Sequence, residues 1–231
     1  MRVLALDAAT EACSVALLHG EEIIGRCALG GLTAAPQLLA MVESVLSEGG
    51  MTLSMLDGMA SSIGPGAFTG VRISVAVAQG LAFGAGLRVA AVTTLEALAL
   101  HAISQGAERC LACLDARMGE VYWGCFAADA ERGVVGMGAP SVGSPPSVVL
   151  PKAGVYQGIG RGFAAYPALA SLPGLELTPE AREALPNARD IARLGALRLR
   201  RGEALDPADL QPLYLRDKVA LTEAERRARA P

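Results

Sequence analysis

The sequence of 231 residues is poor in aromatic side chains and in charge, which account for 4% and 19% of its residues. Histidine occurs only at His19 and His101, so no histidine pair stands at the i, i+4 spacing with which a helix holds a metal ion. The net charge of −3 lacks the basic excess of a protein that grips nucleic acid by itself. The sequence therefore does not indicate a histidine-based metal site or autonomous nucleic-acid binding.

Long hydrophobic runs are also missing, although 52% of the residues are hydrophobic. The longest stretch without charge or proline, 73–87, falls short of the ~20 residues that cross a bilayer. At the N-terminus the apolar run 3–6 stops at Asp7, so a signal peptide is not predicted. We expect a cytoplasmic protein without a membrane span.

The five cysteines do not suggest a disulfide framework, because their number is odd and the context is not secretory. Cys110 and Cys113 lie within a strand-like run, where side chains three residues apart face opposite sides of a sheet. This spacing favours core positions over a redox or zinc site. Hydrolysis by a serine, histidine and aspartate set has no support either, because neither histidine lies in a motif and no nucleophile elbow is present.

Apolar runs bounded by turn residues predict an alternation of strands and helices, which is typical of an α/β protein. The predicted strands are 3–6, 13–18, 23–29, 59–63, 89–92, 110–114, 120–126 and a strand-like piece at 210–214. The predicted helices are 33–48, with Thr33 as its N-cap, 71–86, 95–104 and 188–201. The proline-rich span 140–186 is expected to consist mostly of loops.

Two segments about 108 residues apart repeat one pattern. In each, an apolar strand ends in an aspartate, Asp7 or Asp115, a short turn follows, and a second strand returns. The repeat predicts a duplicated α/β unit.

Three loops could carry chemistry, and each has a structural alternative. The tip 7–10 could hold magnesium and phosphate oxygens, or it could be a plain hairpin turn. The glycine-rich loop 64–70 could bind an anion, but it lacks the P-loop lysine and Pro65 removes one amide, so a tight strand-to-helix turn is the stronger alternative. At the tip 115–120, structural ion pairing explains the charges as well as catalysis does.

The predicted helix 71–86 is apolar nearly all round. Ala76, Gly80 and Gly84 recur every four residues and form a stripe with almost no side chains. Packing on the protein's own sheet and contact with a partner explain this stripe equally well.

Four motifs occur together and in order: LALDAATEACSVAL at 4–17, GPGAFTGVR at 64–72, LDARMGEVY at 114–122 and QPLYLR at 211–216. In this combination the sequence resembles the bacterial TsaB (YeaZ) family over most of its length. The resemblance implies the actin-like ATPase (ribonuclease H-like) fold, an α/β fold with two lobes from a duplicated unit and mixed sheets flanked by helices. We expect an N-terminal lobe at 1–105, a C-terminal lobe at 106–212, and a tail at 213–231 that returns to the first lobe.

The same resemblance implies a non-catalytic subunit that helps to form threonylcarbamoyladenosine beside the anticodon of tRNA. Its partners would be TsaD, which is the catalytic transferase, and the ATPase TsaE. It would touch tRNA only through the complex. The helices predicted at 33–48 and 71–86 would form the main subunit interface, and alone the chain would form a homodimer through these same helices. The expected interface consists of Leu38, Leu39, Val42, Val45, Leu46, Arg72, Ala76, Gly80, Phe83 and Gly84.

No catalytic residue, metal or cofactor is expected in the chain itself, although ATP with magnesium could bind at the complex interface. A degenerate nucleotide site would comprise Asp7, Thr10, Gly64, Gly66, Thr69, Gly70 and Asp115. Ala8 and Ala67 replace hydroxyl residues that the family usually has there, and Thr33 lies where the family often has histidine. The alternative function is an independent ATPase or small phosphotransferase of the same fold. A peptidase has no support from any residue.

Overall fold

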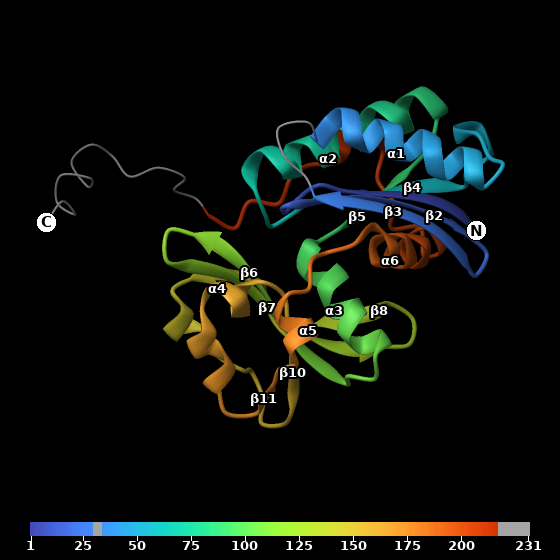
Figure 1. Ribbon diagram of the computed structural model, residues 1–231. Helices are drawn as coiled ribbons and strands as arrows, with labels where there is room; N and C mark the ends of the chain where they lie inside the picture. The colour runs from blue at the N-terminus through green and yellow to red at the C-terminus, as the bar shows by residue number, and fades with distance from the viewer. Residues whose placement is uncertain (30–33, 217–231) are drawn as a thin grey trace, which may run out of the picture.

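The computed structural model describes residues 1–29 and 34–216 as two α/β lobes, one above the other in Figure 1. The first lobe contains a five-stranded sheet in the order β3-β2-β1-β4-β5. The strands are β1 (Arg2–Asp7), β2 (Ala12–His19), β3 (Glu22–Leu29), β4 (Gly58–Ser62) and β5 (Val89–Val92). β1 pairs antiparallel with β2 and parallel with β4.

The second sheet repeats this arrangement, with β8-β7-β6-β10-β11 matching β3-β2-β1-β4-β5 in order and direction. A short strand, β9, also pairs with β7. The strands are β6 (Arg109–Arg117), β7 (Glu120–Asp129), β8 (Gly133–Gly136), β9 (Ser141–Gly143), β10 (Tyr156–Ile159) and β11 (Leu175–Glu176). The duplicated unit predicted from the two aspartate-ended strands is therefore confirmed.

Helices cover both faces of the first sheet, α1 and α2 on one side and α6 on the other (Figure 1). The helices are α1 (Ala34–Glu48), α2 (Phe68–Ala85), α3 (Thr94–Ser104), α4 (Gly162–Ala165), α5 (Pro179–Arg182) and α6 (Ala188–Arg200). α3 packs on the second sheet, so α3 and α6 share the apolar layer between the two sheets. α6 approaches the first sheet closely because it has glycine at 195, where a Cβ atom would lie 2.4 Å from the Cβ of Ala60.

The last helix of each expected lobe packs on the sheet of the other lobe. α3 lies within 1–105 but packs on the second sheet, and α6 lies within 106–212 but packs on the first sheet. The hydrogen bond from the Leu213 amide to the Ile63 carbonyl brings the chain back to the first lobe. The boundaries at 105 and 212 remain a prediction, and residues 217–231 of the expected tail lie outside the described residues.

Most predicted strands and helices are confirmed within one to three residues. For α3, Thr93 forms the capping box with Glu96, and for α6, Asn187 accepts the Arg189 amide. Thr33, the predicted N-cap of α1, lies outside the described part of the chain.

The span 140–186 consists mostly of loops, as predicted, but it also contains β10, which occupies an inner position of the second sheet and is too short to show periodicity. Two predictions were wrong in detail. Residues 210–214 form no strand, and their backbone is held by individual hydrogen bonds instead. α2 begins at Phe68 rather than at residue 71. Ala67, with an extended backbone, is its N-cap, and the glycine at 70 lies within its first turn.

Of the described helices, α2 alone is long and apolar enough to cross a membrane by length and composition. Its earlier start extends it beyond the run counted in the sequence. The side chains of Val71, Val75, Ala78 and Ala82 are nevertheless buried on one face. This face packs against the first sheet, mainly at β4, as expected of a helix that covers a sheet.

Candidate functional site

The first candidate loop is the turn after β1, where the Asp7 side chain is completely buried. One carboxylate oxygen accepts the Ala9 amide at 3.1 Å, and the other has no hydrogen-bond partner among the described residues. Burial raises the pKa of Asp7 from 3.8 to about 6, against the opposing effects of Ser62 and the Ala9 amide. Asp7 points into the protein and does not line the cleft that lies between the two lobes, so it is poorly placed to hold a magnesium ion in that cleft.

The glycine-rich loop 64–70 closes tightly on this turn. A Cβ atom on Gly66 would lie 2.1 Å from the Ala9 carbonyl oxygen, and one on Gly70 would lie 2.0 Å from the Ala8 oxygen. The Ala67 amide donates to the Ala9 oxygen at 2.7 Å. The glycines therefore allow two backbones to touch, which supports the tight-turn interpretation over a phosphate cradle.

The amides of the hairpin tip are also committed to internal hydrogen bonds. The Ala8 amide donates to the Ser74 hydroxyl at 2.7 Å, and the Ala9 amide donates to Asp7. Thr69 lies in the first turn of α2 and does not line the cleft. A phosphate group would therefore have to displace existing contacts of this loop and this turn.

The second hairpin tip, between β6 and β7, carries charges that pair with each other. Asp115 accepts the Arg117 amide at 2.8 Å and forms an ion pair of 2.9 Å with the Arg117 guanidinium. Arg117 and Met118 both have positive φ, 61° and 57°, which non-glycine residues adopt rarely. Across the tip, Glu120 forms an ion pair with Arg216 of the C-terminal segment.

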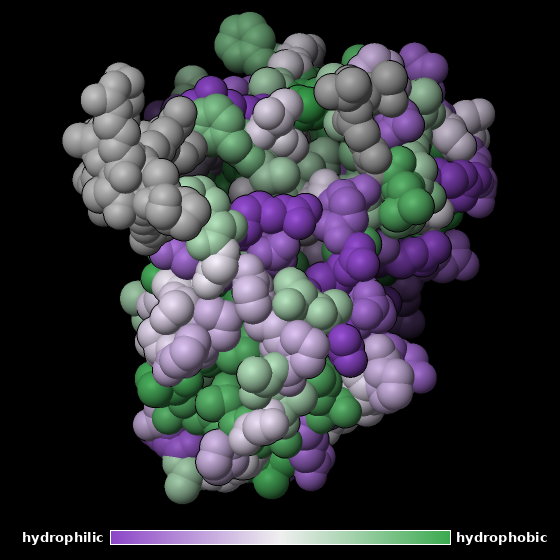
Figure 2. Space-filling model, turned by 60° about the vertical axis from the view of Figure 1, so that its left-hand side comes forward, coloured by the Kyte–Doolittle hydropathy of each residue, from purple (hydrophilic) through white to green (hydrophobic). Residues whose placement is uncertain are grey.

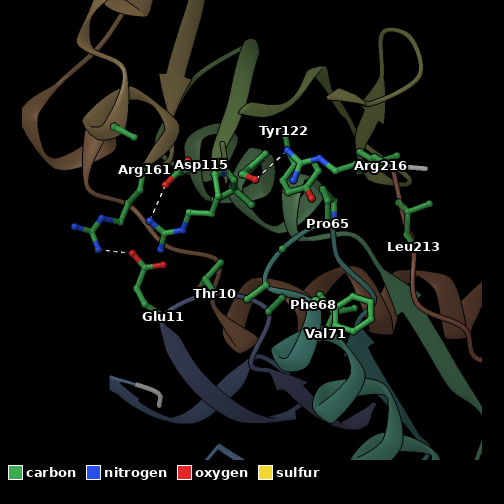
Figure 3. Close-up of a pocket in the computed structure, with 18 of the residues that line it drawn as sticks. Thr10, Glu11, Pro65, Phe68, Val71, Asp115, Tyr122, Arg161, Leu213 and Arg216 are labelled. Atoms are coloured by element: carbon green, nitrogen blue, oxygen red, sulfur yellow. Dashed lines mark hydrogen bonds and ion pairs between the residues drawn. The ribbon is translucent and has the colours of Figure 1, made fainter. Parts of the chain in front are cut away.

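A cleft of about 640 Å³ lies between the lobes and is lined by both hairpin tips, the glycine-rich loop, α4 and residues 213–216 (Figure 3). It brings together Thr10, Gly66 and Asp115 of the predicted nucleotide site. Asp7, Gly64, Thr69 and Gly70 do not line it. An ion pair between Glu11 and Arg161 bridges the two lobes at this cleft.

The surface of the waist between the lobes is largely hydrophilic (Figure 2). Within the described residues no three histidine, cysteine or acidic side chains are grouped to hold a metal ion. The two acidic side chains that line the cleft, Glu11 and Asp115, form ion pairs with Arg161 and Arg117. These ion pairs engage both acidic groups of the cleft, and one of them joins the two lobes.

The predicted interface residues divide into two groups. Leu38, Val42, Val45 and Leu46 are buried in the chain's own core beneath α1. The other six residues are exposed at the surface: Leu39, Arg72, Ala76, Gly80, Phe83 and Gly84. The sequence pattern of α1 therefore marks its packing on the sheet, whereas α2 keeps an exposed apolar face.

The C-terminal segment contacts the first lobe from Leu205 onward, earlier than the tail predicted to begin at residue 213. Leu205 pairs with Val89 by two backbone hydrogen bonds, and Gln79 of α2 donates to the carbonyls of Pro207 and Leu210 at 3.0 Å each. Tyr214 then accepts a hydrogen bond from Arg72. The available signal was Gln79, which with Ser74 is one of two polar residues within the apolar run 73–87.

Comparison with known proteins gives consistent matches. Residues 34–136 match the family model of TsaD, tRNA N6-adenosine threonylcarbamoyltransferase. The chain is 37% identical to the tRNA threonylcarbamoyladenosine biosynthesis protein TsaB of Escherichia coli K12, over 95% of this chain and 96% of that protein. The Haemophilus influenzae protein of the same name is 34% identical, over 95% of each chain.

Among solved structures, YeaZ from Pseudomonas aeruginosa is 40% identical and superposes with a TM-score of 0.82, covering 93% of this chain and 99% of that one. The two mixed sheets flanked by helices thus form an actin-like (ribonuclease H-like) fold. Near-complete coverage at this level of identity shows that the chain belongs to the TsaB (YeaZ) family of tRNA threonylcarbamoyladenosine biosynthesis proteins.

Proposed function

We propose that the chain is a non-catalytic scaffold subunit of the tRNA threonylcarbamoyl transferase complex. It binds the catalytic TsaD subunit, with TsaE, and thereby supports formation of threonylcarbamoyladenosine beside the anticodon. It acts in the cytoplasm and contacts tRNA only through the complex. Membership of the TsaB family supports the pathway, and the exposed face of α2 supports the scaffold role.

The outward face of α2 is the observation that carries this proposal. Phe83 is 80% exposed, and Ala76, Gly80 and Gly84 are also exposed. A Cβ atom on either glycine would meet no heavy atom within 4 Å, so their small size serves no packing within this chain. A row of small residues every four positions forms a groove, into which the i±4 ridge of another helix fits at a crossing angle of about −50°.

The cleft gives no comparable support to an independent ATPase or phosphotransferase. Such an enzyme needs a carboxylate that reaches magnesium and free amides that reach phosphate. Asp7 is buried, and the Ala67 amide is bound to Ala9. We therefore assign no catalytic residue and no cofactor to the chain, and place any ATP with magnesium at the interface of the complex.

In isolation, we expect the same face of α2 to pair with a second copy. An apolar helix surface that lacks its partner favours self-association. The homodimer and the complex with TsaD would then compete for the same side chains, chiefly Phe83 and the small-residue row.

Reconstitution tests the proposal. Modification of tRNA is measured with TsaD and TsaE of the same organism, with and without this chain, and TsaD binding is measured by isothermal titration. We expect activity to require the chain. Gly80→Leu should weaken TsaD binding about 10- to 100-fold by overfilling the groove, without loss of fold.

The matched control is Ala170→Leu, which adds a similar side chain at an exposed site on the second lobe. Its TsaD affinity should equal that of the wild type. Undiminished TsaD binding by a folded Gly80→Leu protein would refute the scaffold face. Micromolar ATP binding by the chain alone, with turnover that Asp7→Asn abolishes, would favour the enzyme instead.

A further inference from the structure

Arg72 is held in a fixed orientation at the N-terminal end of the exposed face of α2. Its guanidinium carbon lies 3.7 Å from the ring centroid of Phe68, within the range of a cation–π contact. Its Nε atom donates a hydrogen bond of 2.8 Å to the Tyr214 hydroxyl. The two aromatic rings lie 5.8 Å apart, so they support the same guanidinium from α2 and from the C-terminal segment.

This arrangement leaves one edge of the guanidinium available. Nε is used by Tyr214, whereas neither terminal nitrogen of Arg72 has a hydrogen-bond partner among the described residues. These two nitrogens form the fork that binds both oxygens of a carboxylate. Because stacking and the Tyr214 bond already restrict the side chain, binding costs less conformational entropy than at a mobile arginine.

The position of Arg72 links it to the groove. Residues 72, 76, 80 and 84 follow one i+4 row, so the arginine stands at the end of the small-residue groove. It is the single charged residue of α2, which contains no acidic side chain. The positive end of the helix dipole lies at the same end and favours an anionic group there.

We propose that Arg72 is the specificity anchor of this face, and that it binds the carboxylate of an aspartate or glutamate on the partner helix lying in the groove. The inference rests on the proposed function and adds the chemistry of the partner, which would be a helix with an apolar face and an acidic residue at one end. Planar, two-pronged donation suits a carboxylate. A phosphate would call for further donors, yet the nearby Arg216 is paired with Glu120 and the Ala67 amide with Ala9.

The test is titration of TsaD from the same organism, without nucleotide or phosphate, into the full chain and its variants. Arg72→Lys keeps the charge but loses the fork, and should weaken binding roughly 10- to 100-fold with the salt dependence retained. Arg72→Met should lose both affinity and part of the salt dependence. Tyr214→Phe should weaken binding less, because it removes only the bond that orients Arg72.

A double-mutant cycle guards against a purely structural effect of Arg72. Each acidic residue on the TsaD contact surface is changed to its amide and titrated against wild type and Arg72→Met. At one acidic position of TsaD, the change to the amide should weaken binding to the wild-type chain but should not weaken binding to the Arg72→Met variant any further. Thermal unfolding of each variant confirms that the chain remains folded.

The outcomes separate this inference from the proposed function. If Gly80→Leu weakens binding and Arg72→Met does not, the scaffold stands and the anchor is refuted. If no acidic position couples to Arg72, or if Arg72 matters only after ATP or inorganic phosphate is added, the carboxylate assignment is wrong. If a folded Gly80→Leu protein binds TsaD as the wild type does, the proposed scaffold face fails, and the inference that rests on it fails with it.

Discussion

Asp7→Asn removes a buried carboxyl group from the end of β1 while preserving its shape. In the wild type, burial raises the pKa of Asp7 from 3.8 to about 6. Asparagine retains an oxygen that can accept the Ala9 amide, as one carboxylate oxygen does now. We expect the substitution to stabilise the protein at neutral pH, because it removes the free energy needed to keep a charged group out of water.

The sign follows from the protons bound in each state. Between pH 3.8 and 6 the native state keeps the proton of Asp7 and the unfolded state has lost it, so stability falls as pH rises. A raised pKa of about 2 units corresponds to about 3 kcal/mol. The difference between Asp7→Asn and wild type should thus be absent below pH 3.8, should grow through this window, and should level off above pH 6.

The measurement is urea unfolding of both proteins from pH 3.5 to 8, with the difference in free energy plotted against pH. Asp57→Asn is a control of opposite sign, because hydrogen bonds from Arg2 lower the pKa of Asp57. That variant should be less stable than wild type at neutral pH, and the difference should disappear as the pH falls through the lowered pKa. The titration of the wild-type Asp7 carboxyl, followed by NMR, should have its midpoint near pH 6.

A wild type that gains stability relative to Asp7→Asn between pH 4 and 7 would refute this reasoning. So would an NMR midpoint at or below 3.8. The variant also bears on function. Asp7→Asn should leave TsaD binding and reconstituted tRNA modification unchanged, because the side chain is buried and does not line the cleft between the lobes.

Two further predictions concern packing. Gly66→Ala should destabilise the protein by about 2 kcal/mol or more, because its Cβ atom would lie 2.1 Å from the Ala9 oxygen. Gly84→Ala has open space around its Cβ atom and should add up to about 1 kcal/mol to the stability of the helix. Urea unfolding of the two variants and the wild type measures both effects. Gln79→Ala removes two hydrogen bonds to the segment around Leu210 and should cost about 1–3 kcal/mol, with faster amide exchange after residue 205. Unchanged exchange in that variant would show that Gln79 does not hold the segment.

Local sequence signals predicted most of the fold correctly because they act over a few residues. The apolar runs of β1 and β6, each ending in aspartate, revealed the duplication. The predicted bounds 95–104 and 71–86 lie close to the observed helix ends, where the structure shows a capping box at Thr93 and a left-handed glycine at 86. β10 escaped prediction because four residues in a buried strand carry too little pattern, although it is an inner strand of the sheet.

The candidate sites were less predictable, because their meaning depends on which backbone lies opposite each loop. The glycines of 64–70 are suitable both for an anion loop and for a close turn. The close approach of the Ala8 and Ala9 carbonyls to Gly70 and Gly66 favours the turn. In the same way, the apolar pattern of α1 predicted a buried stripe but could not tell the chain's own sheet from a partner.

Short-range patterns and motifs were enough to predict the α/β class, the duplicated unit, the family and the small-residue row on α2. The three-dimensional packing was needed to show that this row is exposed, that Asp7 is buried, and that Tyr214 hydrogen-bonds to Arg72. These three facts depend on contacts between residues distant in sequence. Such contacts arise from the packing of whole layers, which no local pattern of residues specifies.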